Sequence, residues 1–205
     1  MKIITLISLI LLSSVALGKN NYTNYDYWPP LYDAKIRGCS NNHTWGQVRT
    51  NSDGSKRWHD GWDLYSIDGD MEAKAISRKS TVVYTGKIGN YGNVVLLKDT
   101  TSIIPIYPMY AHLKNIKVKK GDILNGGDVV GIVGRTGYEN NHSIPTHLHF
   151  EIWLSFKRGA GNIPISSRGR ISPLQIFGAE MFNYMITGCD KKTFKYNLRY
   201  AKNNK

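Results

Sequence analysis

The sequence is poor in acidic residues and in cysteine, and it has no long apolar segment after its first dozen residues. It contains 15 acidic against 27 basic residues, which gives a formal net charge of +12. Such a charge favours anionic partners, for example bacterial wall polymers, anionic lipid or nucleic acid. There is no zinc-finger spacing and no RNP-like motif, and the basic residues are scattered, so we expect no nucleic-acid partner. A solvated basic surface without a dedicated binding patch explains the charge equally well.

The main apolar segment lies at the N-terminus, where residues 3–12 follow the basic Lys2. Residues 16–18 form a small-x-small cleavage pattern. Together these features predict a signal peptide over residues 1–18 and a protein secreted to the periplasm or the extracellular space. The apolar segment is short for a membrane span and no later segment is longer, so we expect no stable span.

The two cysteines, Cys39 and Cys189, lie near opposite ends of the mature chain. In an oxidising compartment they would pair and close a long loop. Such a bond would stabilise the protein by a few kcal/mol (~2–4), mainly through the unfolded state. The alternative is a pair of free thiols.

Short strand-like runs alternate with glycine-rich turns from residue 58 onward. This spacing predicts an antiparallel all-β domain, either a sandwich or barrel-like. No period of roughly 20–50 residues indicates a repeat protein. The predicted strands cover residues 72–76, 81–85, 93–98, 106–112, 123–124, 129–133 and 147–154.

The segments on either side of this domain have a different composition. Residues 19–57 form a polar N-terminal arm and a loop-rich lead-in that covers part of the domain, and residues 155–171 form a loop. Ser172 and Pro173 have N-cap and N1 chemistry, and Gly188 can stop the helix that follows. The predicted packing face of that helix is Leu174, Phe177, Met181, Phe182 and Met185; residues 193–200 alternate as a half-buried strand would, and a basic tail ends the chain.

A His-x-His pattern occurs in the last predicted strand of the domain. Because side chains alternate along a strand, His147, His149 and Glu151 share one face, and the apolar residues between them face a core. Imidazole is a preferred zinc ligand, so the two histidines could belong to a metal site. Two surface histidines on a half-exposed strand remain the alternative.

Two further patterns could complete such a site. His59 and Asp63 are four residues apart, and Gly61 between them argues against a helix, so we place both on a loop entering a strand. An imidazole and a carboxylate, with one distant imidazole, make a three-ligand zinc set with an open fourth position. His112 ends a strand-like run; alone, it would be interpreted as a surface residue.

Taken in order, the motifs are His-x-Gly-x-Asp at residues 59–63, Tyr-Ala-His-Leu at 110–113, Gly-Asp at 121–122 and His-Leu-His-Phe-Glu at 147–151. This ordered set resembles the lysostaphin/LytM-type zinc endopeptidases, which hydrolyse peptidoglycan. The connecting phrases at 82–86, 91–95 and 131–137 match as well. The resemblance covers about residues 58–155 and trails off at 172–174.

The resemblance implies a compact antiparallel β-domain of the duplicated hybrid motif type, with one zinc ion per chain at the floor of a groove. By motif position, His59, Asp63 and His149 would be the zinc ligands, and His147 and His112 the catalytic imidazoles. Zinc lowers the pKa of a bound water, and a neutral His147 can move its proton to the leaving amine. His112 could share that role or hydrogen-bond the oxyanion.

Several residues remain ambiguous at this stage. Glu151 either orients an imidazole or faces solvent. His43 and His142 match no motif position and are interpreted as ordinary polar residues. The loops at residues 103–105 and 143–146 depart from the family pattern, which leaves the substrate choice open.

We therefore expect a monomeric, secreted zinc endopeptidase that cleaves crosslinks or stem peptides of bacterial peptidoglycan. Its metallopeptidase domain would span residues 58–178, followed over 179–205 by the end of the helix, the strand and the tail. A non-catalytic relative acting as a wall-binding scaffold or activator is the alternative, although such relatives typically lose zinc-site residues. A wall-binding module or toxin whose basic tail binds a partner is a second alternative.

Overall fold

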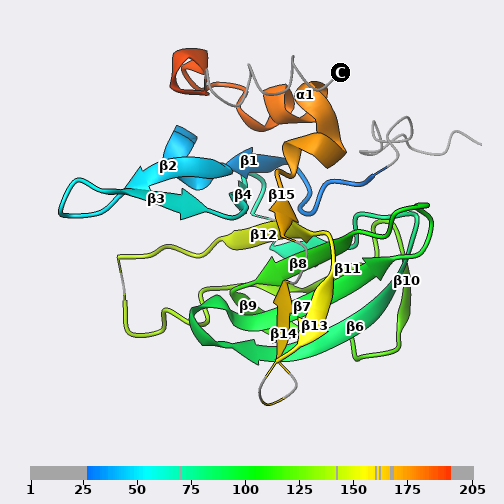
Figure 1. The fold of residues 1–205 in the computed structure, drawn as a ribbon. Helices are drawn as coiled ribbons and strands as arrows, with labels where there is room; N and C mark the ends of the chain where they lie inside the picture. Colours follow the sequence, from blue (N-terminus) through cyan, green and yellow to red (C-terminus); the bar gives the residue numbers. More distant parts are fainter. Residues whose placement is uncertain are drawn as a thin grey trace, which may run out of the picture.

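The computed structural model describes residues 27–69, 71–141, 143–159, 161, 163–166 and 169–194. Its strands are arranged antiparallel, which confirms the predicted all-β class. Figure 1 shows the strands stacked beneath the helix α1 (Leu174–Met185). The strands are β1 (Ala34–Ile36), β2 (Gly46–Thr50), β3 (Lys56–His59), β4 (Trp62–Ser66), β5 (Glu72–Lys74), β6 (Lys79–Ile88), β7 (Gly92–Asp99), β8 (Tyr107–Ala111), β9 (Leu113–Ile116), β10 (Ile123–Asn125), β11 (Val129–Val133), β12 (Leu148–Trp153), β13 (Phe156–Arg158), β14 (Pro164–Ser166) and β15 (Arg170–Ile171).

The main sheet has the strand order β1-β4-β12-β8-β7-β6-β10, with β15 added beside β12. Strand β12 lies inside this sheet, between β4 and β8, and every one of its residues is buried. Leu148, Phe150 and Ile152 enter the larger hydrophobic core, as the alternation predicted. The opposite face of the same strand presents the histidines, so the central strand both anchors the core and carries the site. A smaller sheet, β5-β11-β9, completes the domain.

Helix α1 covers the core next to β1 and β4 (Figure 1). All five residues of its predicted packing face are buried. Trp62 of β4 packs against Phe177 and Phe182, with ring centroids 5.8 and 5.5 Å apart. The helix begins one residue later than predicted, since Pro173 rather than Ser172 is the N-cap, and it ends at Met185 before reaching Gly188.

The prediction that residues 31–57 are rich in loops needs correcting, because this segment contains β1, β2 and part of β3. Strand β1 pairs with β4 at the edge of the main sheet, and β2 and β3 form a separate hairpin. A disulfide joins Cys39 to Cys189, as predicted, and so ties this segment to the chain beyond α1. The strands were missed because β1 has three buried residues in a row and β2 is mostly polar, so neither alternates in hydrophobicity.

The other flanking segments also differ from expectation. Residues 155–171 contain the short strands β13, β14 and β15 rather than a plain loop. Where a strand was predicted over 193–200, Lys191–Phe194 form a 3-10 helix, and the rest of that prediction lies outside the described residues. The predicted signal peptide and His142 also lie outside them. Among the helices of the described part, none has the length and apolar character needed to cross a membrane.

Candidate metal centre and its groove

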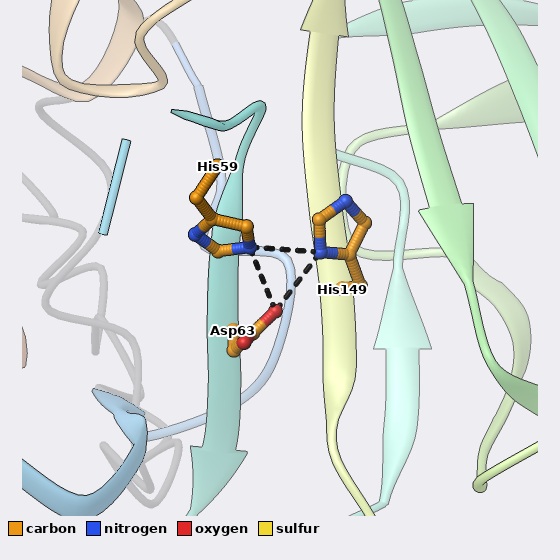
Figure 2. Close-up of side chains that lie close together, drawn as sticks. All are labelled: His59, Asp63 and His149. Atoms are coloured by element: carbon orange, nitrogen blue, oxygen red, sulfur yellow. Dashed lines mark hydrogen bonds and ion pairs between the residues drawn. The ribbon is translucent and has the colours of Figure 1, made fainter. Parts of the chain in front are cut away.

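Three side chains from three strands meet at one point of the structure (Figure 2). His59 ends β3, Asp63 lies on β4, and His149 lies on β12 directly opposite Asp63 in the sheet register. His59 Nε2 is 3.2 Å from both Asp63 Oδ1 and His149 Nδ1, and His149 Nδ1 is 2.9 Å from Asp63 Oδ1. These are the three residues predicted to share a metal ion.

The prediction that His59 and Asp63 lie on one loop is wrong. The two residues lie on two different strands, β3 and β4, which a tight turn joins. Gly61 makes this turn possible. A Cβ atom at this position would lie 2.2 Å from the carbonyl oxygen of Phe150. Only glycine therefore allows β4 to approach β12 closely enough for Asp63 to reach His149.

The hydrogen bonds of the two imidazoles leave one ring nitrogen of each facing the centre. His59 Nδ1 lies 2.7 Å from the carbonyl oxygen of Thr44, to which only an N–H can donate, so its Nε2 carries the lone pair. His149 Nε2 is 2.8 Å from a Glu151 carboxylate oxygen, which leaves Nδ1 facing Asp63. Two imidazole lone pairs and a carboxylate oxygen at these distances need a proton or a cation between them.

This donor set fits a zinc ion. Two histidine nitrogens and one carboxylate oxygen are ordinary zinc ligands, and three donors leave a fourth position open. Donors about 2.0–2.1 Å from one tetrahedral ion lie roughly 3.3 Å apart. The spacings of 2.9–3.2 Å observed here therefore need to widen by only a few tenths of an ångström.

The pKa shifts of the three groups agree with a site that can bind a cation. Burial would raise the pKa of Asp63, but the charge of His59 and hydrogen bonds from His149 and His43 bring it well below its usual value. Burial would lower the pKa of His149, yet its bonds to Asp63 and Glu151 raise it to about 9. Burial lowers the pKa of His59 despite the nearby carboxylate. Without metal, the proton on His149 therefore occupies the place of a cation.

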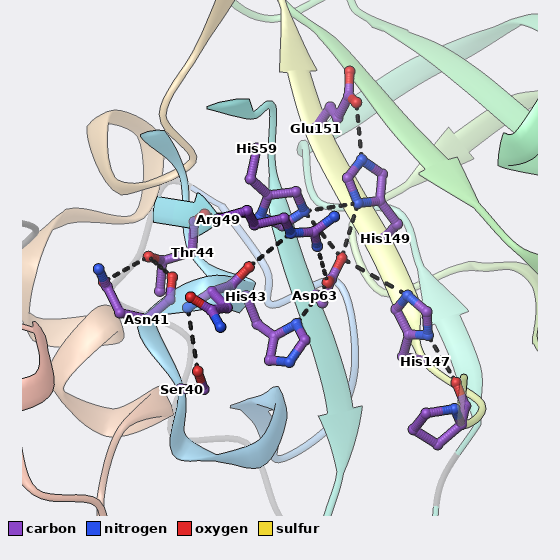
Figure 3. A network of polar contacts seen from close by, with 12 residues as sticks. Ser40, Asn41, His43, Thr44, Arg49, His59, Asp63, His147, His149 and Glu151 are labelled. Carbon is purple, nitrogen blue, oxygen red and sulfur yellow. Dashed lines mark hydrogen bonds and ion pairs between the residues drawn. The ribbon is translucent and has the colours of Figure 1, made fainter. Parts of the chain in front are cut away.

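The second oxygen of Asp63 is held by residues that the sequence interpretation missed (Figure 3). His43 Nδ1 lies 2.8 Å from Asp63 Oδ2, and Arg49 Nη2 donates to the same oxygen at 2.5 Å. Arg49 also donates to the carbonyl of Asn42, which fixes its guanidinium. No family motif covers these two positions. His43 precedes Asp63 by 20 residues and Arg49 precedes it by 14, and neither spacing is a sequence signal for a contact.

Two more imidazoles flank the centre. His147 Nδ1 and His112 Nδ1 lie 2.8 and 2.9 Å from the carbonyl oxygens of Pro145 and Thr136, so both donate there and keep Nε2 free of a proton. Their ring centroids are 4.8 Å apart, and His147 Nε2 is 3.8 Å from Asp63 Oδ1. Burial lowers the pKa of each to about 4, so both are neutral at pH 7.

The backbone of His112 is strained. Its φ of 60° lies in the left-handed region, which few residues other than glycine adopt, although histidine is enriched there together with asparagine and aspartate. Such strain is retained where the surrounding structure holds it in place. Here the backbone N–H of His112 donates to Tyr91 O at 2.8 Å and its ring donates to Thr136, so both ends of the residue are fixed.

Glu151 does not face solvent, so only the first of its two predicted alternatives fits. It is fully buried and accepts hydrogen bonds from His149, Tyr91, Trp153 and Arg170. Its contact with Nε2 turns Nδ1 of His149 toward Asp63. Burial would raise the pKa of Glu151, but its bond to His149 lowers it, so it remains a carboxylate.

Residues 57–161, just over half of the chain, match the model of peptidase family M23. The chain belongs to peptidase family M23. This confirms the family resemblance stated from the motifs. The matched segment contains His59, Asp63, His112, His147 and His149, whereas His43 and Arg49 lie before it.

Two curated relatives match parts of this M23 protein. One, named as an uncharacterized metalloprotease of Buchnera aphidicola subsp. Baizongia pistaciae, is 41% identical over 66 residues, which are 32% of this chain and 16% of that protein. The other, endolysin 2638A of Staphylococcus phage 2638A, is 28% identical over 97 residues, 46% of this chain and 19% of that protein. The M23 protein thus spans less than a fifth of the length of either relative.

A solved structure of the SpoIIQ–SpoIIIAH pore-forming complex shares the fold, with a TM-score of 0.50 and 18% identity. The alignment covers 75% of the M23 protein and 91% of that chain. The likeness therefore extends well beyond the 57–161 segment, into the flanking strands or the helix. At this identity it bears on the fold and not on the activity.

The candidate metal centre lines a groove. The five histidine and aspartate residues of the site line it together with Trp58, Tyr91, Tyr138 and Ile144, and three arginines contribute to its walls. His43, Asn42 and Thr50 from the lead-in also line the groove. The groove is therefore built jointly by the M23 segment and by residues 37–50 before it.

Proposed function

We propose that this M23 protein is a secreted zinc-dependent endopeptidase that hydrolyses peptide bonds in bacterial peptidoglycan. The observation that carries the proposal is the convergence of His59, Asp63 and His149 on one point beside two neutral imidazoles. Family membership supports peptide hydrolysis, and the similarity to a phage endolysin supports a wall substrate. A disulfide between Cys39 and Cys189 fits an oxidising compartment.

The proposed mechanism assigns each side chain one task. His59, Asp63 and His149 would hold one zinc ion, which supplies Lewis acidity toward the scissile carbonyl and lowers the pKa of the attacking water. Thr44 and Glu151 hold the two ligand imidazoles in the tautomers that face the ion. His43 and Arg49 hold the second oxygen of Asp63, so that only Oδ1 faces the centre.

Proton transfer falls to His147. Its Nε2 carries no proton, because Nδ1–H is committed to the carbonyl of Pro145. It can therefore accept the proton of the attacking water and deliver it to the leaving amine.

The tautomer of His112 bears on its role. Its Nδ1–H is likewise committed to a carbonyl, so Nε2 presents a lone pair to the groove. A lone pair cannot donate to an oxyanion, so we assign His112 to sharing protons with His147, with oxyanion binding only after it has been protonated. The left-handed backbone at His112 would serve to aim the ring.

The test is hydrolysis of purified peptidoglycan by the zinc-loaded protein, with released fragments identified by mass spectrometry. We expect one zinc ion per chain, loss of activity on chelation, and recovery when zinc is returned. Zinc bound at this stoichiometry without soluble fragments from several wall types would favour a non-catalytic scaffold or activator. Absence of zinc binding would overturn the site itself.

A further inference from the structure

We infer that Arg37 and Arg57 form a subsite for a carboxylate of the substrate, so that the preferred peptide carries a free carboxylate close to the scissile bond. This inference rests on the proposed function and deepens it, because it names the substrate class of the same groove. Both arginines line the groove that contains the candidate metal centre.

The charges lining the groove do not balance without an added anion. The lining contains the arginines at 37, 49 and 57 and the aspartates at 60 and 63. Asp63 is a candidate metal ligand that already accepts from Arg49, and Asp60 lies 3.7 Å from Arg170. Within the described part of the chain, the guanidinium groups of Arg37 and Arg57 make no hydrogen bond or ion pair with a carboxylate. These two guanidinium groups are therefore available to an added anion.

Arg37 lies within electrostatic reach of the reacting centre. Its charge acts on the metal-ligand candidate Asp63 and on the proposed base His147. It is half-buried and begins the short 3-10 helix Arg37–Cys39, which is tied down by the disulfide at Cys39. Burial lowers the pKa of Arg37, which means that the cation is partly desolvated and gains from an anionic partner. An anion bound here would sit beside the bond to be cleaved.

Arg57 occupies an unfavourable position on the lead-in hairpin. It lies directly opposite Arg49 in the register between β2 and β3. Like charges opposite one another on a sheet destabilise the pair. Arg49 is compensated by Asp63, whereas Arg57, which is exposed, has no such carboxylate in the described part. A substrate anion would relieve this repulsion.

The chemistry of the side chains favours a carboxylate. A guanidinium is planar and offers paired N–H donors that match the two oxygens of a carboxylate. A peptide with a free carboxylate at this position would therefore be a better substrate than the same peptide with a carboxamide. The discrimination would come from leaving the two guanidinium groups unpaired when the amide is bound.

The experiment compares two peptides that differ only by a carboxylate or a carboxamide next to the scissile bond. For the zinc-loaded protein we expect kcat/KM to be about tenfold higher for the acid, mostly through KM, with the advantage shrinking as salt is raised. Arg37→Gln and Arg57→Gln should each remove most of this preference, lowering kcat/KM for the acid much more than for the amide. Arg37→Lys, which keeps the charge, should retain part of it. Lys98→Gln, an exposed charge change on β7 away from the groove, is the matched control.

The outcomes separate the inference from the proposed function. Cleavage of both peptides with equal kcat/KM, unchanged in the arginine variants, would overturn the carboxylate subsite and leave the peptidase intact. If neither peptide is cleaved, their dissociation constants from the zinc-loaded protein still decide the question. Tighter binding of the acid that is lost in Arg37→Gln supports the subsite, and equal binding overturns it. A melting curve and zinc content for each variant exclude misfolding as the cause.

Discussion

The candidate metal ligands and the groups that hold them come from two different regions of the chain. The M23 segment, residues 57–161, supplies all three candidate ligands and both flanking imidazoles. Asp63 and His149 lie opposite one another in the main sheet, and His59 ends β3. The lead-in, residues 31–56, supplies the contacts around them: the carbonyl of Thr44, His43, Arg49 and Arg37. The candidate ligands thus lie in the segment that matches the family, whereas part of their surroundings comes from the segment before it.

The two regions differ in how they are held in place. Strands β4, β8 and β12 are paired within the main sheet and bury their apolar side chains in the core. The lead-in contributes the three-residue edge strand β1 and the strand β2, which pairs with β3 of the M23 segment, and a disulfide fixes it at Cys39. Substitutions in the core should therefore abolish metal binding or chemistry, and those in the lead-in should adjust them.

The largest effect is expected for Asp63→Ala. Its carboxylate is buried and is shared by two histidines of the core, by His43 and by Arg49. Removing it takes away a metal ligand and leaves the guanidinium without its partner, at a cost of about 3–5 kcal/mol of stability. Zinc content and activity should disappear together. A variant that still binds zinc at full stoichiometry would refute the ligand assignment.

The next largest effect is expected for His147→Ala. The ring contacts Pro145 O rather than the centre, so zinc content should be unchanged. Loss of the proposed base should lower kcat by roughly 10²–10⁴-fold. Kinetics on a wall peptide, with zinc measured on the same sample, check both halves of the prediction. Full turnover in the variant would contradict the general-base assignment.

Removal of the disulfide tests how firmly the lead-in is anchored. The bond joins residues 150 apart in sequence, and loss of a native disulfide typically costs about 2–5 kcal/mol. A Cys39→Ser, Cys189→Ser double variant should unfold at lower denaturant concentration, and zinc binding should be retained. An unchanged midpoint would show that strand pairing alone holds the lead-in in place.

Zinc affinity should depend on pH. Because the pKa of His149 is raised to about 9 in the metal-free protein, its imidazole is protonated at pH 7 and must lose that proton to bind an ion. Affinity should rise about tenfold per pH unit toward pH 9 and then level off. Competition with a chelator of known affinity measures the slope. Calorimetry in two buffers with different ionisation enthalpies should show about one proton released per zinc ion at pH 7.

The smallest effect is expected in the lead-in itself, for His43→Ala. This change removes one of the two contacts to Asp63 Oδ2 and leaves Arg49 in place. Zinc affinity should fall by about 10-fold, at the lower end of the range for residues that support a ligand. His43→Asn, whose amide can still donate, is the matched control and should recover part of the loss. Equal affinity in all three proteins would mean that the lead-in only covers the site.

The sequence was most informative where side-chain periodicity and motif coincide. Alternation along residues 147–152 correctly placed Phe150 in the core and the histidines on the other face. It was least informative for residues 31–57, because β1 is buried on consecutive residues and β2 is polar. A strand without alternation is identified by what it pairs with, and that partner is distant in the sequence.

What the sequence by itself determined is the set of groups available: the family motifs, the cysteine pair, and an all-β domain that carries His59, Asp63 and His149. Tertiary structure alone decided which atoms of those groups face one another. The tautomer of His149 depends on a buried Glu151. The position of Asp63 depends on His43, at the end of a 3-10 helix, and on Arg49 of β2. Hydrogen bonds act over about 3 Å, so their partners follow from the packing of the strands and not from their order along the chain.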